Sequence, residues 1–95
     1  MAGIRVQRTV KTLKASGKAV GQVVTYGPNK YVIVEETSAG LKAICLYYMV
    51  VGDQYTEIEI PPATVVWVEV REYWKAYCHI RWGEIARLYP RIDGG

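Results

Sequence analysis

The chain has 95 residues, of which 51% are hydrophobic and 22% charged, and its formal net charge is +3. That length supports one hydrophobic core but no enclosed cleft between two domains, which favours a binding module over an enzyme. No apolar stretch is long enough to cross a bilayer, and "MAGIRVQRTV" lacks the apolar segment of a secretory signal. We therefore expect a single cytoplasmic domain over residues 1–95, with no membrane attachment.

Charge is unevenly distributed along the chain. Residues 1–34 contain six cations and no acid, residues 35–72 carry a net charge of −5, and residues 73–95 carry +2. A positive section can bind phosphates, but it can also meet the acidic section of a second copy or be balanced within the fold. The charge pattern therefore predicts nucleic acid as the partner, with a homo-oligomer as the assembly.

Few residues of the nucleophilic and metal-binding types are present. Cys45 and Cys78 form no CxxC pair and His79 is the only histidine, so a zinc site would lack ligands. Cys78 and His79 are adjacent, and neighbours diverge by about 100° on a helix or face opposite sides of a strand. The sequence also shows no paired acids or phosphate loop. We predict no catalytic residue, no metal and no cofactor.

The N-terminal residues permit two interpretations. Their cations recur at helical spacing, whereas the many β-branched residues among them prefer extended structure. We predict a strand in this stretch, whose cations are Arg5, Arg8, Lys11, Lys14 and Lys18.

A β-hairpin is the clearest element. The stretches "KAVGQVVTY" and "KYVIVEET" flank "GPN", where Gly27, Pro28 and Asn29 supply the backbone angles of a tight turn. After a second turn at "TSAG", the apolar run "LKAICLYYMVV" suits a strand that is buried on both faces. Its periodicity also allows a helix over residues 38–51.

Two more strands and a helix follow a turn at "VGDQ". "YTEIEI" alternates as a half-buried strand does, and "TVVWVEV" resumes the sheet after Pro61 and Pro62 interrupt it. Residues 71–89 change to helical spacing. Gly83 costs a helix about 1 kcal/mol relative to Ala, which favours an end before that residue. The predicted apolar face of the helix consists of Tyr73, Trp74, Tyr77, Ile80, Ile85 and Leu88.

Five short strands and one helix describe a mainly β fold. We predict a small SH3-like, Sm-like or OB-like barrel over residues 1–70, a C-terminal helical segment over residues 71–89 and a flexible tail over residues 90–95. A helix over residues 38–51 would instead give an α+β fold of the β-grasp type. The secondary structure of that stretch therefore distinguishes the two folds.

Residues 13–37, "LKASGKAVGQVVTYGPNKYVIVEET", resemble the first motif of Sm-like proteins. The shared features are a basic and apolar strand, a Gly turn, a strand with an internal Gly, a short loop and an apolar strand that ends in acids. The resemblance implies an RNA-binding barrel that assembles into a ring. Gly27 and Tyr31 stand where that family presents an aspartate and an asparagine to uridine, so the implied likeness is one of shape.

The C-terminal "LYPRIDGG" is similar to the tail of the small subunit of molybdopterin synthase and of ubiquitin-like sulfur carriers. The matching residues are Pro90, Ile92, Gly94 and Gly95. The resemblance implies that an activating enzyme adenylates the carboxylate of Gly95. Such chemistry needs a slender, flexible tail, and glycine lets the backbone pass close to an active site.

Interleaved cations and aromatic residues suggest the main function. Stacking combined with phosphate contact is the physics of single-strand binding, so we predict a non-enzymatic module that binds RNA or single-stranded DNA as an oligomer. Core packing is the alternative role for the aromatic residues, and we expect it for Trp67 and Trp74. A sulfur carrier and a structural or virion-associated self-assembling protein are the other candidate functions. The predicted nucleic-acid-binding residues are Arg5, Arg8, Lys11, Lys14, Lys18, Tyr26, Lys30, Tyr31, Arg81 and Trp82.

Overall fold

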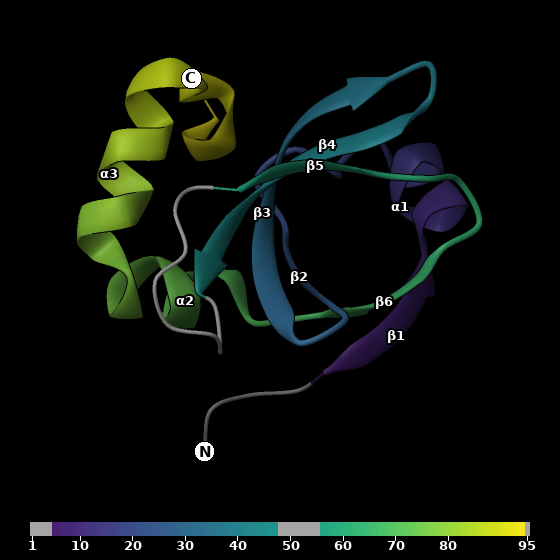
Figure 1. The fold of residues 1–95 in the computed structure, drawn as a ribbon, viewed down its shortest axis with the longest axis horizontal. Helices are drawn as coiled ribbons and strands as arrows, with labels where there is room; N and C mark the ends of the chain where they lie inside the picture. The colour runs from purple at the N-terminus through teal and green to yellow at the C-terminus, as the bar shows by residue number, and fades with distance from the viewer. Residues whose placement is uncertain (1–4, 48–55, 95) are drawn as a thin grey trace.

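The computed structural model describes residues 5–47 and 56–94, and its strands form one antiparallel sheet in the order β1-β6-β2-β3-β4-β5 (Figure 1). The strands are β1 (Val6–Thr9), β2 (Val23–Tyr26), β3 (Asn29–Thr37), β4 (Gly40–Tyr47), β5 (Glu57–Ile60) and β6 (Val65–Val68). The helices are α1 (Val10–Ser16), α2 (Arg71–Tyr77), α3 (His79–Leu88) and the 3-10 helix η1 (Pro90–Asp93). The predicted mainly β fold is confirmed, and the described sheet has six strands instead of five.

The N-terminal stretch contains a strand and then a helix. β1 pairs with β6, and α1 starts directly after it, with the Thr9 hydroxyl accepting a hydrogen bond from the Thr12 amide at 3.2 Å. Gly17 ends the helix in the left-handed conformation at φ 70°, and Val10 and Leu13 are buried on one side of the helix. The predicted strand is correct for β1 and wrong for α1, because capping and burial outweigh the preferences of the β-branched residues.

The predicted hairpin is confirmed as β2 and β3. Tyr26 pairs with Asn29 across a two-residue connection made by Gly27 and Pro28. Gly27 has a φ of 63° and the proline ring holds a negative φ, which is the pattern of a type II′ turn. This turn matches the twist of the flanking strands, so the local sequence alone sets the register of the hairpin.

Strands β3 and β4 are buried on both faces. The inner face of the curled sheet packs against α1, and the outer face packs against α3 and η1 (Figure 1). The inner cluster includes Val10, Leu13, Val24, Ile33, Cys45 and Val66. The outer cluster includes Val23, Val32, Ile44, Leu46, Trp82, Ile85 and Ile92. Residues 40–47 thus form the two-sided strand that was predicted. The β-grasp helix is wrong over this range, and residues 48–51 lie outside the described part.

The later strands alternate as predicted. In β5, Glu57 and Glu59 are exposed while Ile60 is buried, and in β6 the buried Val66 precedes the exposed Trp67. This alternation places one side of each strand on the inner cluster. The turn predicted at "VGDQ" lies outside the described residues.

The C-terminal segment forms two helices that meet at Cys78. This residue leaves helical geometry at φ −112° and ψ 42°, and Gly83 lies inside α3, so the predicted end before Gly83 is wrong. The break also changes which side chains face the sheet. The side chains that are buried or partly buried there are Trp74, Cys78, Trp82, Ile85, Ala86 and Tyr89. Four residues predicted for the apolar face are instead exposed, namely Tyr73, Tyr77, Ile80 and Leu88.

Arg71, the first residue of α2, joins the C-terminal segments to the sheet. Its guanidinium donates hydrogen bonds to the carbonyl oxygens of Gly21 at 3.0 Å and Ile92 at 2.6 Å. The same group lies 5.0 Å from the centre of the Trp82 ring. One side chain therefore holds the turn before β2, α3 and η1 together.

The residues before the terminal glycines are packed against the domain. Ile92 is 1% exposed, and the Asp93 carboxylate accepts a hydrogen bond from the Trp82 indole at 2.9 Å and pairs with Lys75 at 3.0 Å. The predicted flexible tail is therefore wrong for residues 90–93, because an apolar side chain and a charged side chain both find partners in the preceding helices.

The close approach of Gly21 to η1 generates a first prediction. Gly21 has a φ of 92°, and a Cβ there would lie 2.7 Å from the Ile92 carbonyl oxygen. We expect Gly21→Ala to lower the free energy of unfolding by about 2 kcal/mol or more, through backbone strain and displacement of η1, as measured by urea denaturation. Gly17→Ala is the control, because its φ is 70° but nothing lies within 4 Å of the added Cβ. Equal losses in the two variants would contradict the role of this contact.

The contacts of Asp93 generate a second prediction. Hydrogen bonds from Lys75 and then Trp82 lower the pKa of Asp93 below its ordinary value of 3.8. The resulting stabilisation is complete above about pH 4 and is lost as the pH falls through the folded-state pKa. We expect Asp93→Asn to lower the free energy of unfolding at neutral pH by about 1 kcal/mol, because these contacts are partly exposed. Its melting temperature should then fall less than that of the unsubstituted chain as the pH drops below about 4. Glu36→Gln, at an exposed carboxylate, is the control for removal of one negative charge, and its free energy of unfolding at neutral pH should stay within about 0.5 kcal/mol of that of the unsubstituted chain.

Candidate nucleic-acid interface

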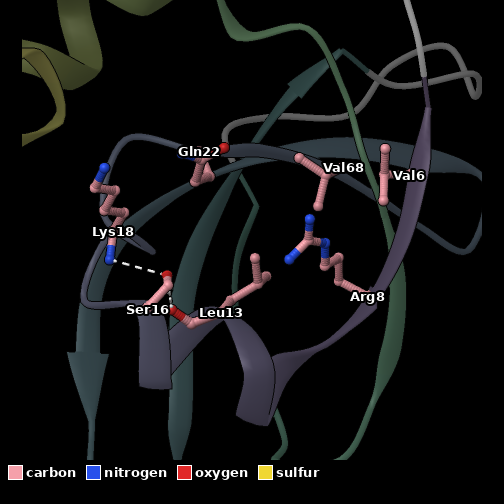
Figure 2. Close-up of a pocket in the computed structure, with 7 residues that line it drawn as sticks. All are labelled: Val6, Arg8, Leu13, Ser16, Lys18, Gln22 and Val68. Carbon is pink, nitrogen blue, oxygen red and sulfur yellow. Dashed lines mark hydrogen bonds between the residues drawn. The ribbon is translucent and has the colours of Figure 1, made fainter.

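Several cations predicted for the site lie around β1 and α1, away from α3 (Figure 1). They border a hollow of about 290 Å³ whose lining residues are Val6, Arg8, Leu13, Ser16, Lys18, Gln22 and Val68. Figure 2 shows the Arg8 guanidinium reaching from β1 toward Val68 and Leu13. The hollow therefore combines apolar walls with cationic groups.

Two cations that line this hollow and one cation of α1 have no partner in the described part of the chain. The side chains of Arg8, Lys11 and Lys18 make no ion pair or hydrogen bond there. No carboxylate lines the hollow, so its positive charge is not neutralised locally. Lys14 differs, because its Nζ donates to the Thr37 carbonyl oxygen at 2.9 Å and thereby anchors α1 to the turn after β3.

Arg5 belongs to a different surface. It pairs with Glu69 at 3.1 Å, and its guanidinium lies 4.8 Å from the centre of the Trp67 ring. Glu69 is 8% exposed and also accepts a hydrogen bond from the Thr25 hydroxyl. The charge of Arg5 is therefore balanced within the fold, unlike that of the cations near the hollow.

Two of the aromatic residues predicted for the site are in the core. Tyr31 is 6% exposed in the inner cluster and Trp82 is 2% exposed in the outer cluster, so neither can stack on a ligand. Tyr26 is half-buried with its ring centre 6.3 Å from that of Tyr31. Arg81 is also half-buried, and its Nη1 donates to the Cys45 carbonyl oxygen at 3.4 Å. The structure therefore does not bring these residues together with the cations of α1.

Trp67 was expected in the core and is instead 39% exposed. Its neighbours Val66 and Val68 face the inner cluster, so the alternation of β6 turns Trp67 to the outer face. The same alternation is visible in "TVVWVEV", and it is the signal that identifies Trp67 as a surface residue. Trp74 is half-buried against the outer cluster, in line with the expected core role.

An aromatic cluster on α2 was missed as a group by the sequence analysis. It consists of Tyr47, Tyr73, Trp74 and Tyr77, whose ring centres lie between 5.1 and 5.9 Å apart in five contacting pairs. Lys30, a predicted site residue, places its Nζ 5.1 Å from the centre of the Trp74 ring. The spacing of Tyr73 and Tyr77 at one helical turn was the available signal.

The thiol of Cys78 and the metal-binding side chains are the other reactive groups that the sequence singled out. Burial raises the pKa of the Cys78 thiol, with an opposing effect from Arg81, so the reactive thiolate is disfavoured at neutral pH. Within residues 5–47 and 56–94, no three His, Cys, Asp or Glu side chains come together to hold a metal ion.

In the described part of the chain, no helix is both long and apolar enough to cross a membrane.

The residues of the sulfur-carrier resemblance are only partly described. Gly94 adopts the left-handed conformation at φ 81°, and its amide donates to the Arg91 carbonyl oxygen at 2.9 Å. Gly95 lies outside the described residues. Residues 90–93 form a 3-10 helix before Gly94, and the sulfur-carrier alternative stays a prediction.

Comparisons with protein-family models, curated proteins and solved structures find no match for this chain. Its function is therefore inferred from geometry and charge.

The unequal exposure of the three tryptophans gives a third prediction. Trp67 is 39% exposed whereas Trp82 is 2% exposed, so Trp67→Phe should remove most of the emission that acrylamide quenches. Trp82→Phe should leave that quenching in place and lower the free energy of unfolding by about 1–3 kcal/mol, because the indole hydrogen bond to Asp93 is lost. Stern–Volmer plots and urea denaturation measure the two effects. Strong quenching that persists in Trp67→Phe would contradict this placement.

Proposed function

We propose that this chain is a non-enzymatic module that binds RNA or single-stranded DNA. The observation that carries the proposal is the pair of unpartnered cations that line the hollow, Arg8 of β1 and Lys18 just after α1, with the unpartnered Lys11 on α1 itself, all within the described part of the chain. Unpaired cations that share one surface attract phosphates and release the counterions that surround them. No carboxylate lines the hollow beside Arg8 and Lys18, so a phosphate there would meet two positive charges and no negative one.

The rest of the charge distribution supports this choice of surface. Two other cations are already engaged, since Lys42 pairs with Glu35 at 3.4 Å and with Glu57 at 3.3 Å, and Lys75 pairs with Asp93 at 3.0 Å. The hollow beside Arg8 adds apolar walls next to the positive charge. A small barrel of the SH3, Sm or OB type is our proposal for the wider fold, and the curling of the six-stranded sheet around the inner cluster supports it (Figure 1).

A charge-removal experiment tests the function. We expect Arg8→Gln/Lys18→Gln to weaken binding to a dye-labelled oligothymidylate and to reduce the slope of log K against log salt by about 1 to 2, since each phosphate contact contributes about 0.7. Fluorescence anisotropy between about 50 and 200 mM salt measures the slope.

Arg87→Gln/Arg91→Gln is the matched control, because it removes two unpartnered cations from α3 and η1 and gives the same net charge. The control should change the slope less than the variant in the hollow. Binding that ignores salt, or equal losses in the two variants, would refute the proposed surface.

A further inference from the structure

A row of aromatic and cationic side chains crosses the outer face of the sheet. Trp67 of β6 pairs in register with Thr25 of β2, and Thr25 pairs with Lys30 of β3. Lys30 in turn lies opposite Tyr47 of β4, at an irregularity in the pairing where Leu46 has no opposite residue. Neighbouring strands are about 4.8 Å apart, so Trp67 and Lys30 are about 10 Å apart along the row.

Helix α2 extends this row with exposed rings. The Tyr47 ring centre lies 5.5 Å from that of Trp74 and 5.8 Å from that of Tyr77. Tyr73 and Tyr77 stack nearly parallel, 8° apart with centres separated by 5.9 Å, although they are 42% and 59% exposed. The two tyrosines are thus held in place by neighbouring rings while much of their surface faces solvent.

Cations accompany the rings at both ends of the row. The Lys30 Nζ lies 5.1 Å from the centre of the Trp74 ring and forms no ion pair with any described residue. The Arg5 guanidinium lies 4.8 Å from the centre of the Trp67 ring. A phosphate near the Trp74 ring therefore meets the Lys30 ammonium, whereas the charge of Arg5 beside Trp67 is already paired with Glu69.

The acids near the row are already engaged. Glu69 is 8% exposed and holds Arg5 and Thr25, while Glu72 of α2 pairs with Arg71. Lys30 is the cation in the row that keeps its full charge available for a ligand. This arrangement suits a ligand that carries both flat rings and negative charges.

We propose that the row from Trp67 to Tyr77 stacks the bases of single-stranded nucleic acid. The inference rests on the proposed nucleic-acid-binding function and adds the surface that stacks the bases, together with the requirement that those bases be unpaired in RNA as well as in DNA. Bases within a duplex are covered on both faces by their neighbours, so exposed protein rings can stack only on unpaired bases. Stacking on aromatic side chains beside a cation is the mode by which single strands are bound.

Tyr73→Ala/Tyr77→Ala tests the inference with three probes, namely an oligothymidylate, an abasic strand of equal length and a DNA duplex. Alanine favours helix, so α2 is retained, and circular dichroism checks that it is. We expect the variant to bind oligothymidylate about 10- to 100-fold more weakly and to bind the other two probes as the unsubstituted chain does. Ile80→Ala/Leu88→Ala is the control, because it removes apolar side chains that are 69% and 75% exposed but not aromatic. The control should bind all three probes normally.

Three outcomes would overturn the inference. The first is unchanged oligothymidylate affinity in the tyrosine variant, and the second is an equal loss for the abasic strand. The third is a change in sedimentation coefficient of the free variant, which would assign the tyrosines to contact between copies. Salt-dependent binding that is sensitive to Arg8 and Lys18 but not to the tyrosines would overturn the stacking row alone. If the unsubstituted chain binds none of the probes, the proposed function fails as well.

Discussion

The burial of β3 and β4 on both faces is the constraint on which the rest of the structure depends. A strand with apolar side chains on both faces cannot leave either face in water, so each face needs its own cover. Helix α1 covers the inner face, and α3 with η1 covers part of the outer face. Among the described residues, neither α1 nor α3 with η1 covers the outer surface around Trp67 and Lys30, and this is where the aromatic row lies.

Polar contacts hold α3 and η1 against the outer face of the sheet. Arg71 satisfies the carbonyl oxygens of Gly21 and Ile92, which belong to segments far apart in sequence. Because its guanidinium is planar and has five donors, one side chain can serve two carbonyl groups and still lie over the Trp82 ring. Residues 90–93 are therefore part of the packed domain, and they position α3 against the sheet.

The sequence predicts elements well where local chemistry decides them. The hairpin follows from Gly27 and Pro28, and the strands around Ile58 and Val66 follow from alternation with period two. The helix after Thr9 was missed because seven residues are too few for periodicity to outweigh β-branched composition. Its formation depends on a cap and on burial against a sheet that is built from later residues.

Some features of the candidate site also follow from local sequence, and others depend on contacts between distant segments. The cations of α1 are neighbours in sequence, so their grouping was predictable, whereas the exposure of each aromatic residue depends on distant contacts. The sequence predicted Trp82, next to Arg81, as a residue that binds nucleic acid, but after the break at Cys78 its side chain lies in the core. The same break leaves Tyr73 and Tyr77 at the surface. No local pattern reveals a change of helix direction of this kind.

The two proposed contact surfaces meet at β1, the first strand in the order of the described sheet. Gln7 lies opposite Trp67 on β6, and the next residue, Arg8, lies opposite Val66, whose side chain faces the inner cluster. Alternation along one short strand therefore places a hollow that can bind phosphate and an end of the stacking row on either side of the same edge. A flexible single strand that bends around this edge can contact both, whereas a stiff duplex can lie along only one of them.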